Sequence, residues 1–223
     1  MTVSTKKIKE HVRLAGEYLL NLERANRLIA REDLIRRAMN ACVDVDNFLT
    51  NPRGTQSEIV GKLSHIMQDI TKVIHEFRKI HKEEKREYKY TESEEATLNE
   101  LYEDMKEARR KAQAELSAEA KEEMITVEKH VQASIRITGN IIKNMDDLHD
   151  NLDNMLAIAE GKKPKRGLWN TLRGFNPSYA DLAAQAQKHS DRVKDLTQAI
   201  VEREREIGGH LESLREHIKA IEK

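Results

Sequence analysis

The chain has 223 residues, of which 35% are charged and only 4% are aromatic, and it contains three prolines and nine glycines. This charge-rich, turn-poor composition is typical of long helices and coiled coils, and so few aromatic side chains predict a thin core without an enclosed substrate pocket. The 39 basic and 39 acidic residues balance, which excludes a polycation that binds nucleic acid over its whole surface.

The sequence contains neither a membrane-spanning segment nor a cysteine pair. No apolar run approaches the roughly 18 residues of a transmembrane helix, and the N-terminus lacks the apolar core of a signal peptide. Cys42 is the only cysteine, and its place on the apolar side of a predicted helix favours a buried small hydrophobe over a reactive thiol. We therefore expect a cytoplasmic protein that could also be peripheral at a membrane.

The first two predicted helices form an antiparallel hairpin. Apolar residues recur at alternating intervals of four and three over residues 5–50, which is the pattern of a coiled-coil seam. Pro52 and Gly54 end this helix, because proline removes a backbone donor and glycine permits a left-handed turn. Thr55 and Glu58 then form a capping box that begins the second helix, over residues 55–88.

Two interpretations are open for the region around residue 90. Thr91 and Glu94 form a second capping box, which favours a corner followed by a long helix over residues 92–160. However, no proline lies between residues 62 and 160, and the heptad seam keeps its phase. The alternative is one continuous helix over residues 57–160, about 150 Å long. We favour the corner.

A weakly packed waist and a second hairpin are predicted further along the chain. Residues 106–123 are rich in alanine and charge and hold a single large apolar residue, Leu116. Beyond them a strong seam returns and continues to Ala159. Asn176 and Pro177 offer a capping side chain followed by a proline at the first helical position, which predicts a last helix over residues 178–222.

These elements predict an all-α fold, an elongated coiled-coil-like bundle of three to four long helices in a single domain over residues 1–223. The last helix is about as long as the part of the third that follows the waist, so we expect these two to pack as an antiparallel hairpin. A helical pair by itself leaves each two-sided seam half exposed, which predicts a homo-oligomer.

The basic loop, residues 161–177, is the main interruption of the helical pattern. It holds the only tryptophan, five basic residues and no acid. Its large apolar residues fall at i, i+1, i+4 and i+7, on one face of a two-turn helix. The residues predicted to dock a partner or a membrane are Lys162, Lys163, Lys165, Arg166, Leu168, Trp169, Leu172, Arg173 and Phe175.

Several roles remain open for this loop. Trp169 and Phe175 could plug the open end of the hairpin, or the loop could dock a protein partner. Basic residues beside a short amphipathic helix with tryptophan also suit an anionic membrane surface. Nucleic acid is the least favoured partner.

An acidic stripe precedes the basic loop. Residues 144–160 carry five acids and no lysine or arginine, and Asp146, Asp150 and Asp153 recur at intervals of four and three. The basic loop could fold back on this stripe and compensate it. Alternatively, the stripe could attract the basic loop of a neighbouring subunit and support head-to-tail assembly.

The sequence carries no catalytic signature. It lacks a Gly-rich phosphate loop, a His-Glu-x-x-His zinc helix and a nucleophile elbow. A di-iron bundle needs two Glu-x-x-His pairs, whereas the nearest match here is Asp146 with His149.

The favoured function is a non-enzymatic, self-assembling coiled-coil scaffold without a cofactor that docks through the basic loop. The alternatives are a protein that binds or remodels membrane surfaces and a helical-bundle metal-binding protein.

Overall fold

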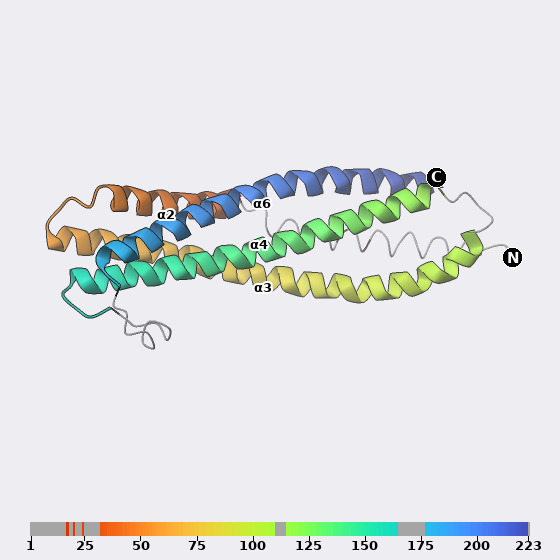
Figure 1. The fold of residues 1–223 in the computed structure, drawn as a ribbon. Coiled ribbons are helices and arrows are strands. Elements are labelled where there is room, and N and C mark those ends of the chain that lie inside the picture. Colours follow the sequence, from red (N-terminus) through yellow and green to blue (C-terminus); the bar gives the residue numbers. More distant parts are fainter. Residues whose placement is uncertain are drawn as a thin grey trace. The chain divides into compact units, whose positions relative to one another are not determined.

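The structure is a computed structural model that describes residues 32–109, 115–164 and 177–222, together with Glu17, Leu20 and Arg24. These residues form an all-α helical bundle, as predicted (Figure 1). Within the described part of the chain, side chains are described for all but residues 88–109, 115–121, 124 and 217–222. The helices are α2 (Glu32–Thr50), α3 (Gln56–Arg109), α4 (Glu115–Ala159) and α6 (Tyr179–Glu222).

The chain divides into two compact units. Unit 1 comprises Met1–Ala30, Ile80–Arg136 and Ile200–Lys223, whereas unit 2 comprises Arg31–Lys79 and Ile137–Ala199. Each of the helices α3, α4 and α6 therefore contributes one segment to each unit.

Unit 2 is a four-helix bundle in which helices that follow one another in the chain run in opposite directions (Figure 1). Side-chain bonds join α2 to α3, α3 to α4, α4 to α6, and α6 back to α2, so the four helices form a closed ring. This up-and-down topology is usual for four-helix bundles in which helices that follow one another in the chain also pack side by side. The joining pairs are Arg37–Glu76, Arg78–Asp146, Asn144–His189 and Asp46–Ser190.

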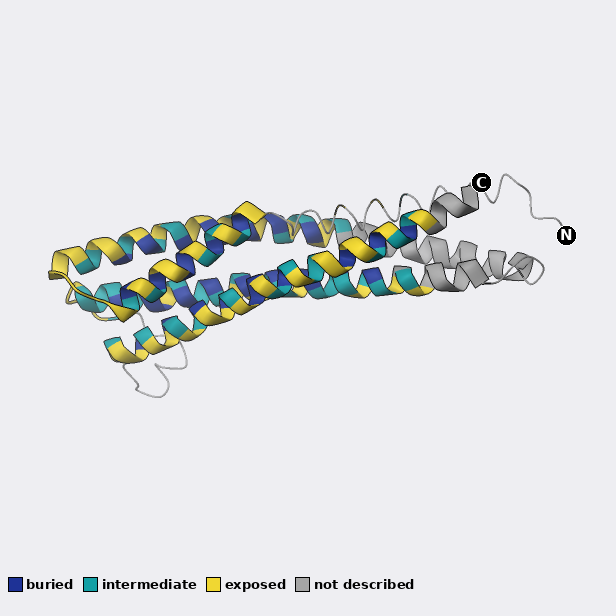
Figure 2. Ribbon diagram, turned by 90° about the horizontal axis from the view of Figure 1, so that it is seen from above, coloured by how far each residue is buried: buried dark blue, intermediate teal, exposed yellow. Residues whose placement is uncertain are grey.

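The core of unit 2 is made by the predicted seams, which face one another across the bundle (Figure 2). Each hairpin covers the apolar face of the other. In this unit the seams are therefore not half exposed, and the reason given above for expecting a homo-oligomer does not apply. The buried residues include Leu34, Cys42, Phe48, Leu63, Ile70, Phe77, Ile141, Met145, Leu148, Leu152, Met155, Leu182 and Val193.

In unit 1, α4 and α6 pack as an antiparallel pair, as the second predicted hairpin requires. His130 of α4 lies beside Arg203 of α6. Glu123, seven residues before His130, lies beside His210, seven residues after Arg203, so the two helices run in opposite directions. The buried apolar residues of this unit include Ile80, Val127, Val131, Ile200, Ile207, Leu211 and Leu214.

The capping box at the start of α3 is confirmed. The hydroxyl of Thr55 accepts a hydrogen bond from the backbone N–H of Glu58 at 3.3 Å. In return, Glu58 Oε2 accepts bonds from the backbone N–H and the hydroxyl of Thr55, at 2.6 and 3.1 Å. The backbone bond is the main reason why the pKa of Glu58 is lowered.

The predicted corner at residue 90 is wrong, and so is one helix over residues 57–160. Helix α3 runs through Thr91 and Glu94 and ends at Arg109, and α4 begins at Glu115 inside the alanine-rich waist. The Thr-x-x-Glu pattern is compatible with a helix interior when its neighbours are strong helix formers such as glutamate and lysine. Apart from Leu116, the waist lacks large apolar side chains through which a continuous helix could pack.

The predicted cap of the last helix is also wrong by two residues. Ser178 caps α6, since its hydroxyl accepts a bond from the backbone N–H of Asp181 at 3.1 Å. Asp181 Oδ2 accepts bonds from the backbone N–H and the hydroxyl of Ser178, at 2.9 and 2.7 Å. This Ser-x-x-Asp pair satisfies two backbone donors reciprocally. Pro177 therefore precedes the cap, and Asn176 lies outside the described residues.

Candidate functional site

The basic loop begins directly after a tightly closed helix end. Gly161 has a positive φ of 72°. The backbone N–H of Gly161 donates to Ile158 O at 3.0 Å, and that of Lys162 donates to Ala157 O at 2.7 Å, which is a Schellman motif. Lys162 and Lys163 are exposed. The other predicted docking residues, 165–175, lie outside the described residues.

The connection between α4 and α6 is much longer than the packing requires. These helices are neighbours in unit 2, yet nineteen residues, 160–178, separate them. By contrast, five residues, 51–55, join α2 to α3. Antiparallel neighbours in bundles are usually joined by 2–8 residues, and loops longer than about 12–15 residues are commonly functional or linkers.

The fold brings a second, unpredicted set of basic residues to the same end of unit 2. Gln56 at the start of α3 donates a hydrogen bond to Ala159 O at the end of α4, which ties the two connections together. Lys62 Nζ donates to Arg53 O at 3.2 Å. Arg53 and Lys62 therefore lie at the end from which the basic loop departs.

Sequence reasoning missed these residues because it treated the two hairpins separately. In an up-and-down bundle, the connection between the first and second helices and the connection between the third and fourth lie at the same end. That topology was the signal that could have found Arg53.

The structure divides the predicted acidic stripe among different environments. Asp146 accepts two hydrogen bonds from Arg78 of α3, at 2.9 and 2.8 Å. The side chain of Asp150 is 83% exposed beside His149, whereas Asp153 is half-buried. The first acid of the stripe is thus compensated by α3.

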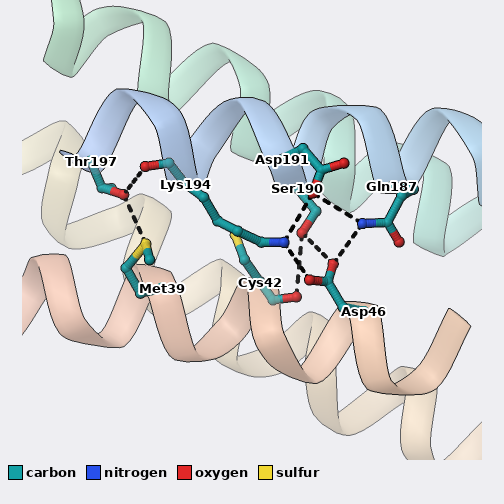
Figure 3. Close-up of polar contacts among 8 residues, drawn as sticks. All are labelled: Met39, Cys42, Asp46, Gln187, Ser190, Asp191, Lys194 and Thr197. Atoms are coloured by element: carbon teal, nitrogen blue, oxygen red, sulfur yellow. Dashed lines mark hydrogen bonds and ion pairs between the residues drawn. The ribbon is translucent and has the colours of Figure 1, made fainter. Parts of the chain in front are cut away.

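A partly buried polar cluster joins α2 to α6 in unit 2 (Figure 3). Asp46 accepts hydrogen bonds from the Ser190 hydroxyl and from Gln187 Nε2, both at 2.9 Å, and forms an ion pair with Lys194. Lys194 also contacts Asp191 on its own helix at 2.9 Å. The cluster satisfies its polar groups internally and so fixes how α2 lies against α6.

Cys42 lies next to this cluster and is fully buried, which confirms the structural role predicted for it. The Ser190 hydroxyl donates to the carbonyl of Cys42 at 3.3 Å. Burial raises the pKa of the Cys42 thiol to about 11, against an opposing hydrogen bond from Ser190. Because the thiolate is the reactive form, this environment does not suit a nucleophile.

We therefore expect Cys42 to resist thiol reagents in the folded protein. A pKa of about 11 lowers the thiolate fraction at neutral pH roughly 100-fold relative to a free cysteine, before burial restricts access. Ellman's reagent added with and without urea measures the difference. As a control, Val43→Cys in a Cys42→Ala chain places the thiol on an exposed position and should react rapidly. Rapid labelling of Cys42 without urea contradicts the expectation.

A histidine cluster joins α4 to α6 in unit 1. His130 and His210 lie with their ring centroids 5.6 Å apart. Nδ1 of His210 is 3.3 Å from Glu123 Oε1, and Nδ1 of His130 is 3.0 Å from Arg203 Nη1 and 3.3 Å from Glu206 Oε2.

The two contacts of His130 require opposite protonation states. Unprotonated Nδ1 accepts a hydrogen bond from Arg203, whereas protonated Nδ1 donates to Glu206. The pKa of His130 is lowered, first by burial and then by the charges of Arg203 and His210, against the opposing effect of Glu206. The neutral ring is therefore favoured at neutral pH, and its bond to Arg203 requires the tautomer with Nδ1 unprotonated.

We expect His130 to make the protein less stable as the pH falls. The unfolded chain takes up this proton near the ordinary value of about 6.5, whereas the folded chain takes it up at lower pH. Folding stability therefore decreases as the pH falls from about 6.5 to the lowered value, and this contribution levels off below it. Urea titrations across this range should show a weaker decrease for His130→Gln, with exposed His75→Gln as the control. Equal pH dependence in His130→Gln and wild type contradicts the expectation.

No metal site is found among the described residues, since no three His, Cys, Asp or Glu side chains there gather around a common position. His189 of α6 is half-buried, and its Nδ1 lies 3.0 Å from the Asn144 side-chain oxygen. It thus has the hydrogen-bonded setting expected of a histidine packed in a helical bundle.

A shallow hollow of about 460 Å³ lies between α3 and α4 on the outside of unit 2. It opens to solvent and has no charged group besides Lys72, which is paired with Asp69 at 2.8 Å. Its lining residues are Ser64, Met67, Gln68, Thr71, Lys72, His149 and Leu156.

None of the described helices combines the length and hydropathy needed to cross a bilayer. No protein-family model, no curated protein and no solved structure matches the chain.

Proposed function

We propose that this chain is a non-catalytic helical scaffold that self-associates and docks a partner through the basic loop, with residues 162–175 as the docking segment. The observation that carries this proposal is the nineteen-residue connection between two neighbouring helices. A Schellman motif ends the first helix and a capping box begins the second, so the helices themselves do not need this additional length.

The composition of the docking segment supports the same role. It adds five positive charges and no acid, and it holds four large apolar residues, among them Trp169. Tryptophan and arginine are enriched in the residues that contribute most to binding energy at protein interfaces. Unit 2 supplies a packed support for this segment, because its core is filled by the seams of all four helices.

Light scattering over a range of protein concentrations tests the proposal. We expect the wild-type mass to rise above that of the 25.8 kDa chain. Replacing residues 165–176 by a Gly-Ser linker of equal length should return the chain to a monomer and leave its helical circular dichroism unchanged. A wild type that stays monomeric at high concentration overturns self-association, and equal association of the linker variant overturns the role of the segment.

A pair of charge variants separates a local effect from a change in total charge. The test variant replaces four basic residues of the segment by glutamine, and the control replaces four exposed basic residues elsewhere in unit 2. We expect the test variant to lose association and the control to retain it. The test positions are Lys162, Lys163, Lys165 and Arg166, and the control positions are Arg36, Lys79, Lys188 and Arg192.

A further inference from the structure

We propose that the α2–α3 turn and the start of the basic loop form one basic end of unit 2 that docks on an anionic lipid bilayer. This basic end is defined by Arg53, Lys62, Lys162 and Lys163. The inference rests on the docking role proposed for residues 162–175 and adds to it a second contact region and the class of partner.

The bond from Gln56 to Ala159 O holds the two connections together. All five residues of the α2–α3 turn are exposed, and so are Lys62, Lys162 and Lys163. Lys62 donates to the carbonyl of Arg53, which places its ammonium group at the turn. Four positive charges are thus presented at one end: Arg53 in the α2–α3 turn, Lys62 in the second turn of α3, and Lys162 and Lys163 at the start of the basic loop.

Three acids at this end offset part of its positive charge, and each of them has a local partner. Glu58 and Asp181 cap the first turns of α3 and α6, and Glu160 pairs with Lys162 at 2.7 Å. Among the described residues, no carboxylate is bonded to the side chain of Arg53 or Lys163. These two cations are therefore available to an external anion.

A bilayer suits this end because it offers anionic headgroups beside an apolar interior, which the acidic stripe of a second copy does not. Asp146, the first residue of that stripe, is already held by two bonds from Arg78. The loop that continues from Lys163 adds three basic residues and four large apolar residues, including Trp169. Basic residues attract anionic headgroups, and neighbouring aromatic and aliphatic side chains enter the interface between headgroups and acyl chains.

Sedimentation of the full chain with phosphatidylcholine vesicles, with and without phosphatidylserine, tests the proposal at low and high salt. We expect binding only with phosphatidylserine and a marked decrease at high salt. Each basic residue near such a surface contributes roughly fivefold to affinity, so Arg53→Glu should weaken binding about tenfold or more. Lys79→Glu, exposed on the same helix pair but outside the basic end, is the matched control.

Trp169 provides an independent measurement, since it is the only tryptophan. We expect its emission to shift to the blue when phosphatidylserine vesicles are added, and to shift back at high salt. Unchanged binding of Arg53→Glu overturns the role of the turn. A wild type that ignores the vesicles but responds to soluble polyglutamate overturns the lipid partner in favour of an acidic polypeptide. Self-association measured by light scattering is a separate result, so the proposed scaffold role can stand or fail independently.

Discussion

Replacing Asp46 by alanine should lower the free energy of unfolding by about 2–3 kcal/mol, because Ser190, Gln187 and Lys194 each lose a bond to its carboxylate. The Ser190 hydroxyl is fully buried, so solvent cannot replace the lost bond, and only its longer contact to the Cys42 carbonyl, at 3.3 Å, remains. Lys194 is 25% exposed and keeps Asp191, which places the expected loss below that of a fully buried ion pair. Urea unfolding followed by far-ultraviolet circular dichroism measures the change.

Two further variants show whether the loss arises from stranded polar groups. Asp146→Ala removes an exposed partner of Arg78 and should cost less than about 1 kcal/mol. The double variant Asp46→Leu with Lys194→Met replaces the ion pair by apolar side chains and should recover most of the stability. If Asp46→Ala costs no more than Asp146→Ala, the cluster does not stabilise the α2–α6 contact.

Replacing Leu152 by alanine should destabilise the protein by about 2–5 kcal/mol, since it leaves a cavity in a packed core. Leu152 is fully buried on α4 in unit 2. Leu156, one turn later on the same helix, is half-buried and lines the open hollow. The same substitution there should cost less than about 2 kcal/mol, because solvent and neighbouring side chains can fill the space.

Urea unfolding of the two alanine variants tests the depth of the core directly. They share the residue type, the helix and the side-chain atoms removed, and they differ only in burial. Equal losses of unfolding free energy would show that Leu152 does not lie in a closed core.

Much of the helical structure could be predicted from sequence. The alternating spacing of apolar residues identified the seam of α4 and the core-facing stripes of α2 and α3. The capping box at Thr55 identified where α3 begins. Such signals are reliable because helix starts and apolar faces depend on residues three or four positions apart.

The errors occurred where one local pattern has more than one use. Thr91 and Glu94 resemble a capping box, yet α3 passes through them, since nothing nearby interrupts the helix. Ser178 displaced Asn176 as the cap of α6 because it forms a reciprocal pair with Asp181. At residue 90 the sequence offered a cap where no helix begins, and before α6 it offered two candidate caps. A local pattern alone does not distinguish these possibilities.

By itself, the sequence determined an all-α chain, the inward stripe of its main helices and the existence of a basic loop with a single tryptophan. Only the tertiary structure decided that Asp46 meets Lys194, 148 residues away, and that Arg53 lies at the end where the basic loop begins. The reason is physical: helix formation follows from hydrogen bonds between residues four apart, whereas helix pairing follows from packing choices between distant segments. A ring of four helices brings loops that are distant in sequence to the same end, and the spacing of residues within one helix does not show which loops these will be.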